Sequence, residues 1–86
     1  MTETDHIMKA WDEIFDFLMT APTPEQIATF KLSDAVQGRL ELLLDKNKRT
    51  RLTEGEEHEL DEYQRMNHMM MLFKARAQEK LVLAKP

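Results

Sequence analysis

Residues 52–81 decide the fold of this chain, and they read LTEGEEHELDEYQRMNHMMMLFKARAQEKL. Apolar side chains recur there at steps of three or four residues, at Leu60, Tyr63, Met66, Met70, Phe73, Ala77 and Leu81. That spacing places them on one face of an α-helix, and Thr53 and Glu56 have the separation of a capping box at its start. We therefore predict a helix over about residues 53–82, about 42 Å long at about 1.5 Å per residue. Because a small domain is only about 30 Å across, part of this helix must overhang its own fold or pair with another chain.

Three shorter helices are predicted upstream, over about residues 4–19, 24–30 and 33–46. The first is amphipathic and carries apolar residues on one face, at Ile7, Met8, Trp11, Ile14, Phe15 and Leu18. Thr23 and Pro24 have the residue types that cap and begin the second helix, and Ser33 caps the third. The sequence therefore predicts an all-α fold in a single helical domain over residues 1–86. We expect a small bundle of three to four helices, in which the first and third pack on the long C-terminal helix.

The composition limits the classes of protein to which this chain can belong. With 86 residues, it buries only about 60–65% of the surface of its unfolded form, so a deep substrate pocket is not expected. It has no cysteine, which excludes disulfides and thiolate zinc sites, and no apolar run approaches the roughly 18 residues of a membrane span. Its N-terminal region carries acids rather than the basic start of a signal peptide. We therefore expect a cytoplasmic protein with no targeting segment and no membrane contact.

Charge is distributed in blocks along the chain, which has a net charge of −4. One acidic block contains Glu3, Asp5, Asp12, Glu13 and Asp16, and a second contains Glu54, Glu56, Glu57, Glu59, Asp61 and Glu62. A basic cluster lies between them, at Lys46, Lys48, Arg49 and Arg51. Two acidic blocks fit a basic protein partner better than a phosphate backbone. The alternative is that these acids form solvated helix faces, since acids near helix N-termini also favour the macrodipole.

The residue types of metal and catalytic sites are present without the spacing that such sites need. His58 and His68 are ten residues apart on the predicted long helix, which separates them by about 15 Å. The second acidic block lies on a helix, whereas calcium loops turn their oxygen ligands inward around a glycine. The single serine, Ser33, already has a capping role. We therefore expect no catalytic residues, no metal, no cofactor and no enzymatic activity.

The methionine-rich run in the long helix is the strongest indication of an interaction surface. It consists of Met66, Met69, Met70, Met71, Leu72 and Phe73. These side chains surround most of the helix, so a single apolar stripe cannot contain them all. Two interpretations stay open: the run is a helical segment surrounded by core on all sides, or one of its faces binds a partner through adaptable methionines.

Several motifs follow one another in a recognisable order: Thr23-Pro24-Glu25-Gln26-Ile27, Leu43-Leu44-Asp45-Lys46-Asn47, Leu52-Thr53, Glu59-Leu60-Asp61-Glu62-Tyr63 and Lys74-Ala75-Arg76-Ala77. Over about residues 22–81 the chain thereby resembles a family of short uncharacterised bacterial all-helical proteins. Members of that family resemble the small partner of toxin–antitoxin or nuclease-linked gene pairs, so the resemblance implies an antitoxin-like role. The motifs are mostly helix starts and ends, and they identify a fold rather than a reaction. The chain departs from the family at Arg49-Thr50, where a glycine-containing turn is expected, and at Met69 to Met71, which replace a leucine-richer stretch.

These patterns predict a non-catalytic interaction module, an antitoxin-like small acidic partner that binds a larger, basic protein through its long C-terminal helix. The residues expected to contact that protein are Glu56, Glu59, Glu62, Met69, Met70, Leu72 and Phe73. We also expect a homodimer. Two alternatives stay open. One is a dimeric DNA-binding regulator that contacts nucleic acid through Lys46, Lys48, Arg49 and Arg51, and the other is a purely structural homo-oligomer.

Overall fold

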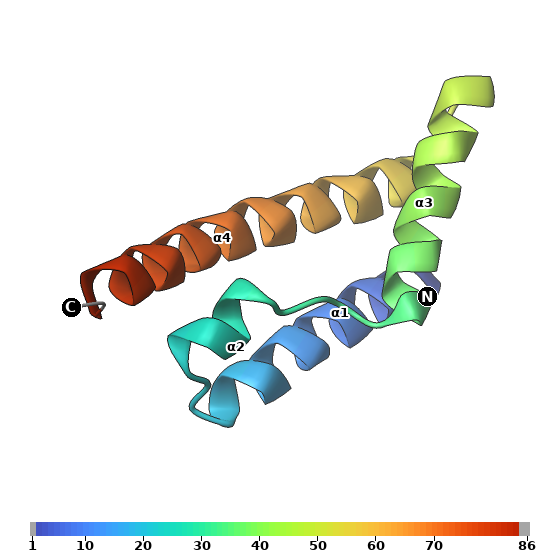
Figure 1. Ribbon diagram of the computed structural model, residues 1–86. Coiled ribbons are helices and arrows are strands. Elements are labelled where there is room, and N and C mark those ends of the chain that lie inside the picture. The colour runs from blue at the N-terminus through green and yellow to red at the C-terminus, as the bar shows by residue number, and fades with distance from the viewer. Residues whose placement is uncertain (1, 85–86) are drawn as a thin grey trace.

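The computed structural model describes residues 2–84, and it confirms the all-α prediction over that range (Figure 1). Its helices are α1 (Thr2–Met19), α2 (Pro24–Ala28), α3 (Asp34–Arg49) and α4 (Glu54–Ala84). The long C-terminal helix is present, as the spacing of its apolar residues predicts. The largest difference from the predicted bounds is in α3, which continues to Arg49, because the basic residues of its last turn face the negative end of the helix dipole.

The predicted helix caps are present in the structure. At the start of α2, the backbone N–H of Gln26 donates to the Thr23 hydroxyl at 3.2 Å, and the Gln26 side chain accepts from the Thr23 backbone at 2.9 Å. Before α4, Thr53 and Glu56 make the same reciprocal pair at 3.1 and 2.9 Å. Each pair satisfies two backbone donors that a helix start would otherwise leave without a partner. The caps therefore fix where the two helices begin.

The helices form an elongated molecule whose principal extents are 52 × 24 × 18 Å. α1 and α4 lie in contact and run in the same direction, whereas α3 crosses the start of α4 at a steep angle (Figure 1). α2 lies between the end of α1 and the second half of α4 in the same view. The first half of α4 therefore contacts two long helices, and the second half is covered mainly by a helix of five residues.

The core lies where α1, α3 and the first half of α4 meet. Its buried apolar side chains are Ile7, Ala10, Ile14, Val36, Leu43, Leu52, Leu60, Tyr63, Met66 and Met70. The start of α3 is fixed to α1 by Glu13, whose carboxylate accepts hydrogen bonds from the backbone N–H and the hydroxyl of Ser33 at 2.8 and 2.6 Å. The first and third helices thus pack on the long helix, as predicted.

Candidate functional site

The two acidic residues at the centre of the predicted partner surface lie inside the fold. Glu59 is fully buried, and its carboxylate accepts two hydrogen bonds from the Arg39 guanidinium and one from the Tyr63 hydroxyl, all at 2.8 Å. Glu56 is nearly buried, and both of its carboxylate oxygens lie 2.7 Å from the Lys46 ammonium nitrogen. These pairs join α3 to α4. Neither carboxylate is open to a partner, which corrects the expectation from sequence.

The pKa values of this polar cluster follow from its burial and its hydrogen bonds. Burial pushes the pKa of Glu59 upward, but the hydrogen bonds from Arg39 and Tyr63 outweigh it and hold that pKa below its usual value. The hydrogen bond from Lys46, helped by the Thr53 backbone, lowers the pKa of Glu56 to about 2. Burial and the bond to Glu59 raise the pKa of Tyr63. The cluster therefore carries fixed charges at neutral pH, and it stabilises the corner between α3 and α4.

The sequence contains a signal for the position of Glu59. It precedes Tyr63 by four residues, which puts it on the same helical face as the apolar stripe that also contains Met66 and Met70. A carboxylate in an apolar stripe requires a buried partner, and Arg39 on the neighbouring helix supplies it. Glu62, by contrast, is half-buried at the contact between α1 and α4. It accepts hydrogen bonds from the Trp11 indole N–H at 3.3 Å and from Arg65 at 2.7 Å.

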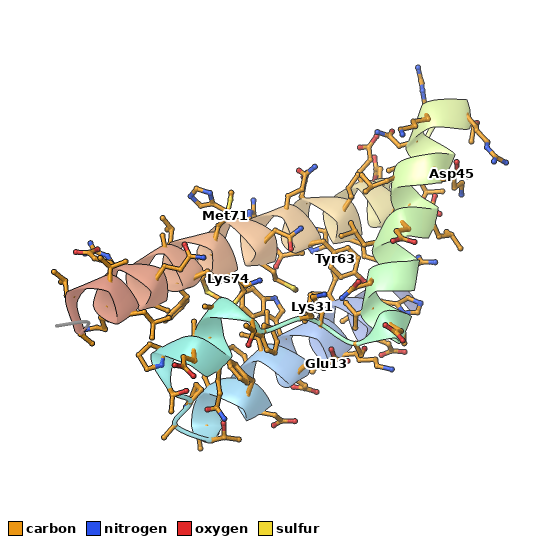
Figure 2. All side chains as sticks on the ribbon, in the orientation of Figure 1. Glu13, Lys31, Asp45, Tyr63, Met71 and Lys74 are labelled. Atoms are coloured by element: carbon orange, nitrogen blue, oxygen red, sulfur yellow. The ribbon has the colours of Figure 1, made fainter. Side chains whose placement is uncertain are left out.

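The methionine-rich run divides between the core and the surface. Met66 and Met70 are buried, and Met69 is half-buried against the core. Met71 points away from the other helices (Figure 2) and is 63% exposed. Leu72 and Phe73 are exposed as well. Part of the run thus belongs to the core and part of it is open to a partner. Of the four apolar residues predicted to bind a partner, Leu72 and Phe73 lie on the exposed surface.

The basic cluster is also divided. Lys46 is turned toward Glu56, whereas Lys48, Arg49 and Arg51 are exposed at the corner between α3 and α4. The Arg49 guanidinium lies 3.2 Å from the carboxylate of Asp45, one turn earlier on α3. Three of the four residues are therefore accessible, and the exposed part of the cluster is small.

Two exposed apolar surfaces are left by this packing. The first, which we call the distal surface, lies on the second half of α4 in two groups, Met71, Leu72 and Phe73 and then Val82 and Leu83, with the exposed Arg76–Glu79 ion pair between them. The second consists of Met8, Trp11 and Phe15 on α1, and Met69 lines a separate hollow on α4 together with Arg65 and Leu72. Met8 and Phe15 are exposed, while Trp11 and Met69 are half-buried. Either surface could bury further apolar area against another chain.

A groove of about 300 Å³ lies between α3, α4 and the segment that precedes α3. Its floor includes Val36, Tyr63 and Met70. Lys31 and Lys74 lie at its edge (Figure 2), but Glu41 lines it as well. Both signs of charge therefore meet at this groove, and they select no particular class of ligand.

The part of the chain that the structure describes holds no group of three or more His, Cys, Asp or Glu side chains placed to bind a metal ion. Among residues 2–84, no helix is both long enough and apolar enough to cross a membrane. The accessible surface is 6455 Å², about a fifth larger than the roughly 5,300 Å² expected of a folded monomer of this size. The bundle thus covers less of its own surface than an ordinary domain of its length.

Comparison with protein-family models, with curated proteins and with solved structures finds no match to this chain. The family resemblance of residues 22–81 therefore stays a prediction. What can be inferred of the protein's function comes from the exposed surfaces of its own helices.

Proposed function

We propose that this protein is a non-catalytic interaction module, antitoxin-like in its role, that binds a larger protein through the distal surface of α4. The observation that carries this proposal is the incomplete covering of that helix. Its first half is packed by α1 and α3, whereas its second half is packed mainly by the five residues of α2. The large accessible surface of the chain has the same origin, since a helix that projects from a bundle exposes most of its circumference.

The distal surface has the chemistry of an anchoring helix. Leu83 is 76% exposed and Val82 is 68% exposed, and both lie about three turns beyond Leu72. Burial of such side chains releases roughly 25 cal/mol for each square ångström of apolar area removed from water. Amphipathic helices commonly bind by placing residues at this spacing in an apolar groove of the partner. The distal surface therefore fits a groove on a larger protein.

The charge of the exposed acids supports a basic partner. Because Glu56 and Glu59 are used inside the fold, the acids available to a partner at the start of α4 are Glu54, Glu57 and Asp61, which are exposed. Exposed charges of one sign mainly raise the rate of association with a partner of the opposite sign, while buried apolar contacts supply most of the affinity. The net charge of −4 acts in the same direction.

Two further features are consistent with the antitoxin-like role. The resemblance over residues 22–81 implies the small partner of a gene pair. A cysteine-free chain also suits the reducing cytoplasm, which is the compartment that we propose. The DNA-binding alternative has less support, because Lys46 is bound to Glu56, which leaves Lys48, Arg49 and Arg51 of the cluster for phosphate neutralisation.

The experiment that tests the proposal compares two leucine substitutions of the same kind. Leu83→Glu changes the distal surface, and Leu42→Glu changes an exposed leucine of α3 that lies outside it. We expect the wild type and Leu42→Glu to capture the same protein from an extract of the native cell, identified by mass spectrometry. Leu83→Glu should weaken the affinity for that protein by at least about tenfold, because a charge would enter an apolar contact.

The antitoxin-like part of the proposal needs a second readout. The captured protein is expressed alone and together with each form of this chain, and cell growth is measured. We expect growth to be inhibited by the captured protein alone and restored by the wild type but not by Leu83→Glu. Equal capture by both variants would show that the distal surface is not the contact. A captured protein that is harmless when expressed alone would leave the interaction standing and contradict the antitoxin-like role.

A further inference from the structure

We infer that α2 is a movable strap on the second half of α4. It hinges at Ala21, in the turn that precedes it, and it lifts from α4 while α1, α3 and the first half of α4 stay folded. Its lifting uncovers a stripe of α4 that consists of Lys74, Ala77 and Leu81, which we call the covered stripe. Such a movement does not depend on the proposed function, because it needs no partner.

The covered stripe is the side of the second half of α4 that faces α2. Among the described residues of α4 beyond Met70, Ala77 is the one that is buried, with 4% of its surface exposed. Lys74 and Leu81 are half-buried, and they lie three residues before and four residues after Ala77, which puts all three on one face of the helix. α2 lies against this half of α4 (Figure 1). A helix of five residues therefore closes most of that face to solvent.

The contacts that hold α2 in place are apolar. None of its five residues is fully buried, and Ile27 and Ala28 are half-buried. Directly after the helix, the ring of Phe30 stacks on that of Phe17 of α1, with 4.3 Å between the ring centroids. Among the described residues, the hydrogen bonds of α2 and its caps stay within residues 23–30. Within that part of the chain, the strap can therefore lift without breaking an interhelical hydrogen bond or ion pair.

The attachment of α3 is much firmer. Two ion pairs join it to α4, Arg39–Glu59 at 2.8 Å and Lys46–Glu56 at 2.7 Å. It also contributes two buried apolar side chains to the core. Segments with few buried contacts open locally at a much lower free energy than the core does. α2 should therefore open while α3 is still attached to α4.

The hinge of the strap is a strained residue. Ala21 is the one non-glycine residue of the described chain with a positive φ, which is 53°. Its backbone N–H donates to the Leu18 carbonyl at 3.2 Å, so it ends α1 in the left-handed conformation that glycine usually supplies. A residue with a Cβ resists this conformation. The strain is present while the chain turns back over α4, and rotation of Ala21 relieves it, so the strain favours the lifted strap.

Two single thiols test whether the covered stripe opens independently of the core. The chain has no cysteine, so Ala77→Cys places one thiol beneath α2 and Ala10→Cys places one at a fully buried core position of α1. The probe is iodoacetamide, with alkylation followed by mass spectrometry and each rate divided by that of the same variant unfolded in urea. We expect alkylation at position 77 to be at least about 100-fold faster than at position 10, because lifting of the strap exposes only the former.

Substitutions at the hinge show whether the strap is the cause. In the Ala77→Cys chain, Ala21→Gly removes the strain of the left-handed conformation, so alkylation should become about fivefold slower. Ala21→Val adds a β-branched side chain, which tolerates a positive φ least, so alkylation should become about fivefold faster. Ile14→Val, a small cavity in the core, is the control. It should accelerate alkylation at position 10 and leave that at position 77 unchanged, because it weakens the whole fold and not the strap.

Circular dichroism verifies that each variant is folded, and hydrogen exchange of the wild type supplies a readout that needs no substitution. The backbone amide of Ile27 in α2 should exchange at a rate that low urea leaves unchanged, whereas exchange at Tyr63 in the core should accelerate as urea is added. Exchange at Ile27 that follows urea as Tyr63 does overturns the inference. So do equal alkylation rates at positions 77 and 10, because α2 then opens only with the whole fold. Alkylation at position 77 that ignores the Ala21 substitutions overturns it as well, since the end of α4 then opens without the strap.

Discussion

The two halves of α4 belong to one uninterrupted helix, and they differ in what lies against them. From Glu54 to Met70, the helix is packed by α1 and α3, and two of its acidic residues, Glu59 and Glu56, have internal partners in Arg39 and Lys46. From Met71 to Ala84, Ala77 is buried, but the large apolar side chains of Met71, Leu72, Phe73, Val82 and Leu83 are exposed. Acids inside and apolar groups outside are both the reverse of the usual preference. The difference teaches that the buried acids of this helix, Glu56 and Glu59, stabilise the fold, whereas its exposed apolar residues are the candidates for binding.

The difference between the two halves of α4 is tested most strongly at Glu59. Its replacement in Glu59→Ala removes the acceptor of three hydrogen bonds and leaves the Arg39 guanidinium and the Tyr63 hydroxyl without their partner. We expect the free energy of unfolding to fall by about 3–4 kcal/mol, as when one partner of a buried ion pair is removed. The measurement is urea unfolding followed by circular dichroism at a fixed protein concentration.

Glu57 supplies the control for this prediction, because it lies on the same turn of α4 and is exposed. Glu57→Ala should change the free energy of unfolding by no more than about 0.5 kcal/mol. Similar losses in both variants would mean that the acidic block acts through its total charge, and the buried pair would then have no special role in stability.

Two adjacent methionines mark the boundary between the halves. Met70 is 6% exposed and packs in the core, whereas the next residue, Met71, is 63% exposed. Met70→Ala should lower the free energy of unfolding by about 2–3 kcal/mol, because it leaves a cavity, and Met71→Ala should change it by less than about 0.5 kcal/mol. The same urea titrations measure both. Equal effects would show that the core continues around the helix at this point.

The sequence predicts the fold better than it predicts the contact residues, for a physical reason. Helix bounds depend on local signals, such as Thr53 before α4, and these signals act through the nearest backbone groups. Whether an acid lies on the surface depends on the partner that another helix brings. Glu59 and Glu62 belong to the same acidic block. Glu59 is buried beside Arg39, which donates to its carboxylate, whereas Glu62 is half-buried at the contact between α1 and α4, where the Trp11 indole donates to it. Likewise, which face of the methionine run is covered depends on where α1 lies against α4.

The smallest expected effect is a loss of stability in acid, and Glu56 and Glu59 in the packed half of α4 contribute to it. Because Lys46 and the Thr53 backbone bind the carboxylate form of Glu56, its pKa falls from 4.5 to about 2 on folding. Above pH 4.5 the carboxylate is ionised in both states and its contribution to stability is fully present. As the pH falls from 4.5 toward 2, the unfolded chain takes up the proton first, so the free energy of unfolding decreases. The lowered pKa of Glu59 acts with the same sign.

Urea midpoints measured across this pH range should fall, and Lys46→Met should make the decrease shallower. If the urea midpoint falls equally steeply with pH in Lys46→Met, the Lys46–Glu56 ion pair does not couple protonation to folding. That pair would then no longer distinguish the packed half of α4 from its second half.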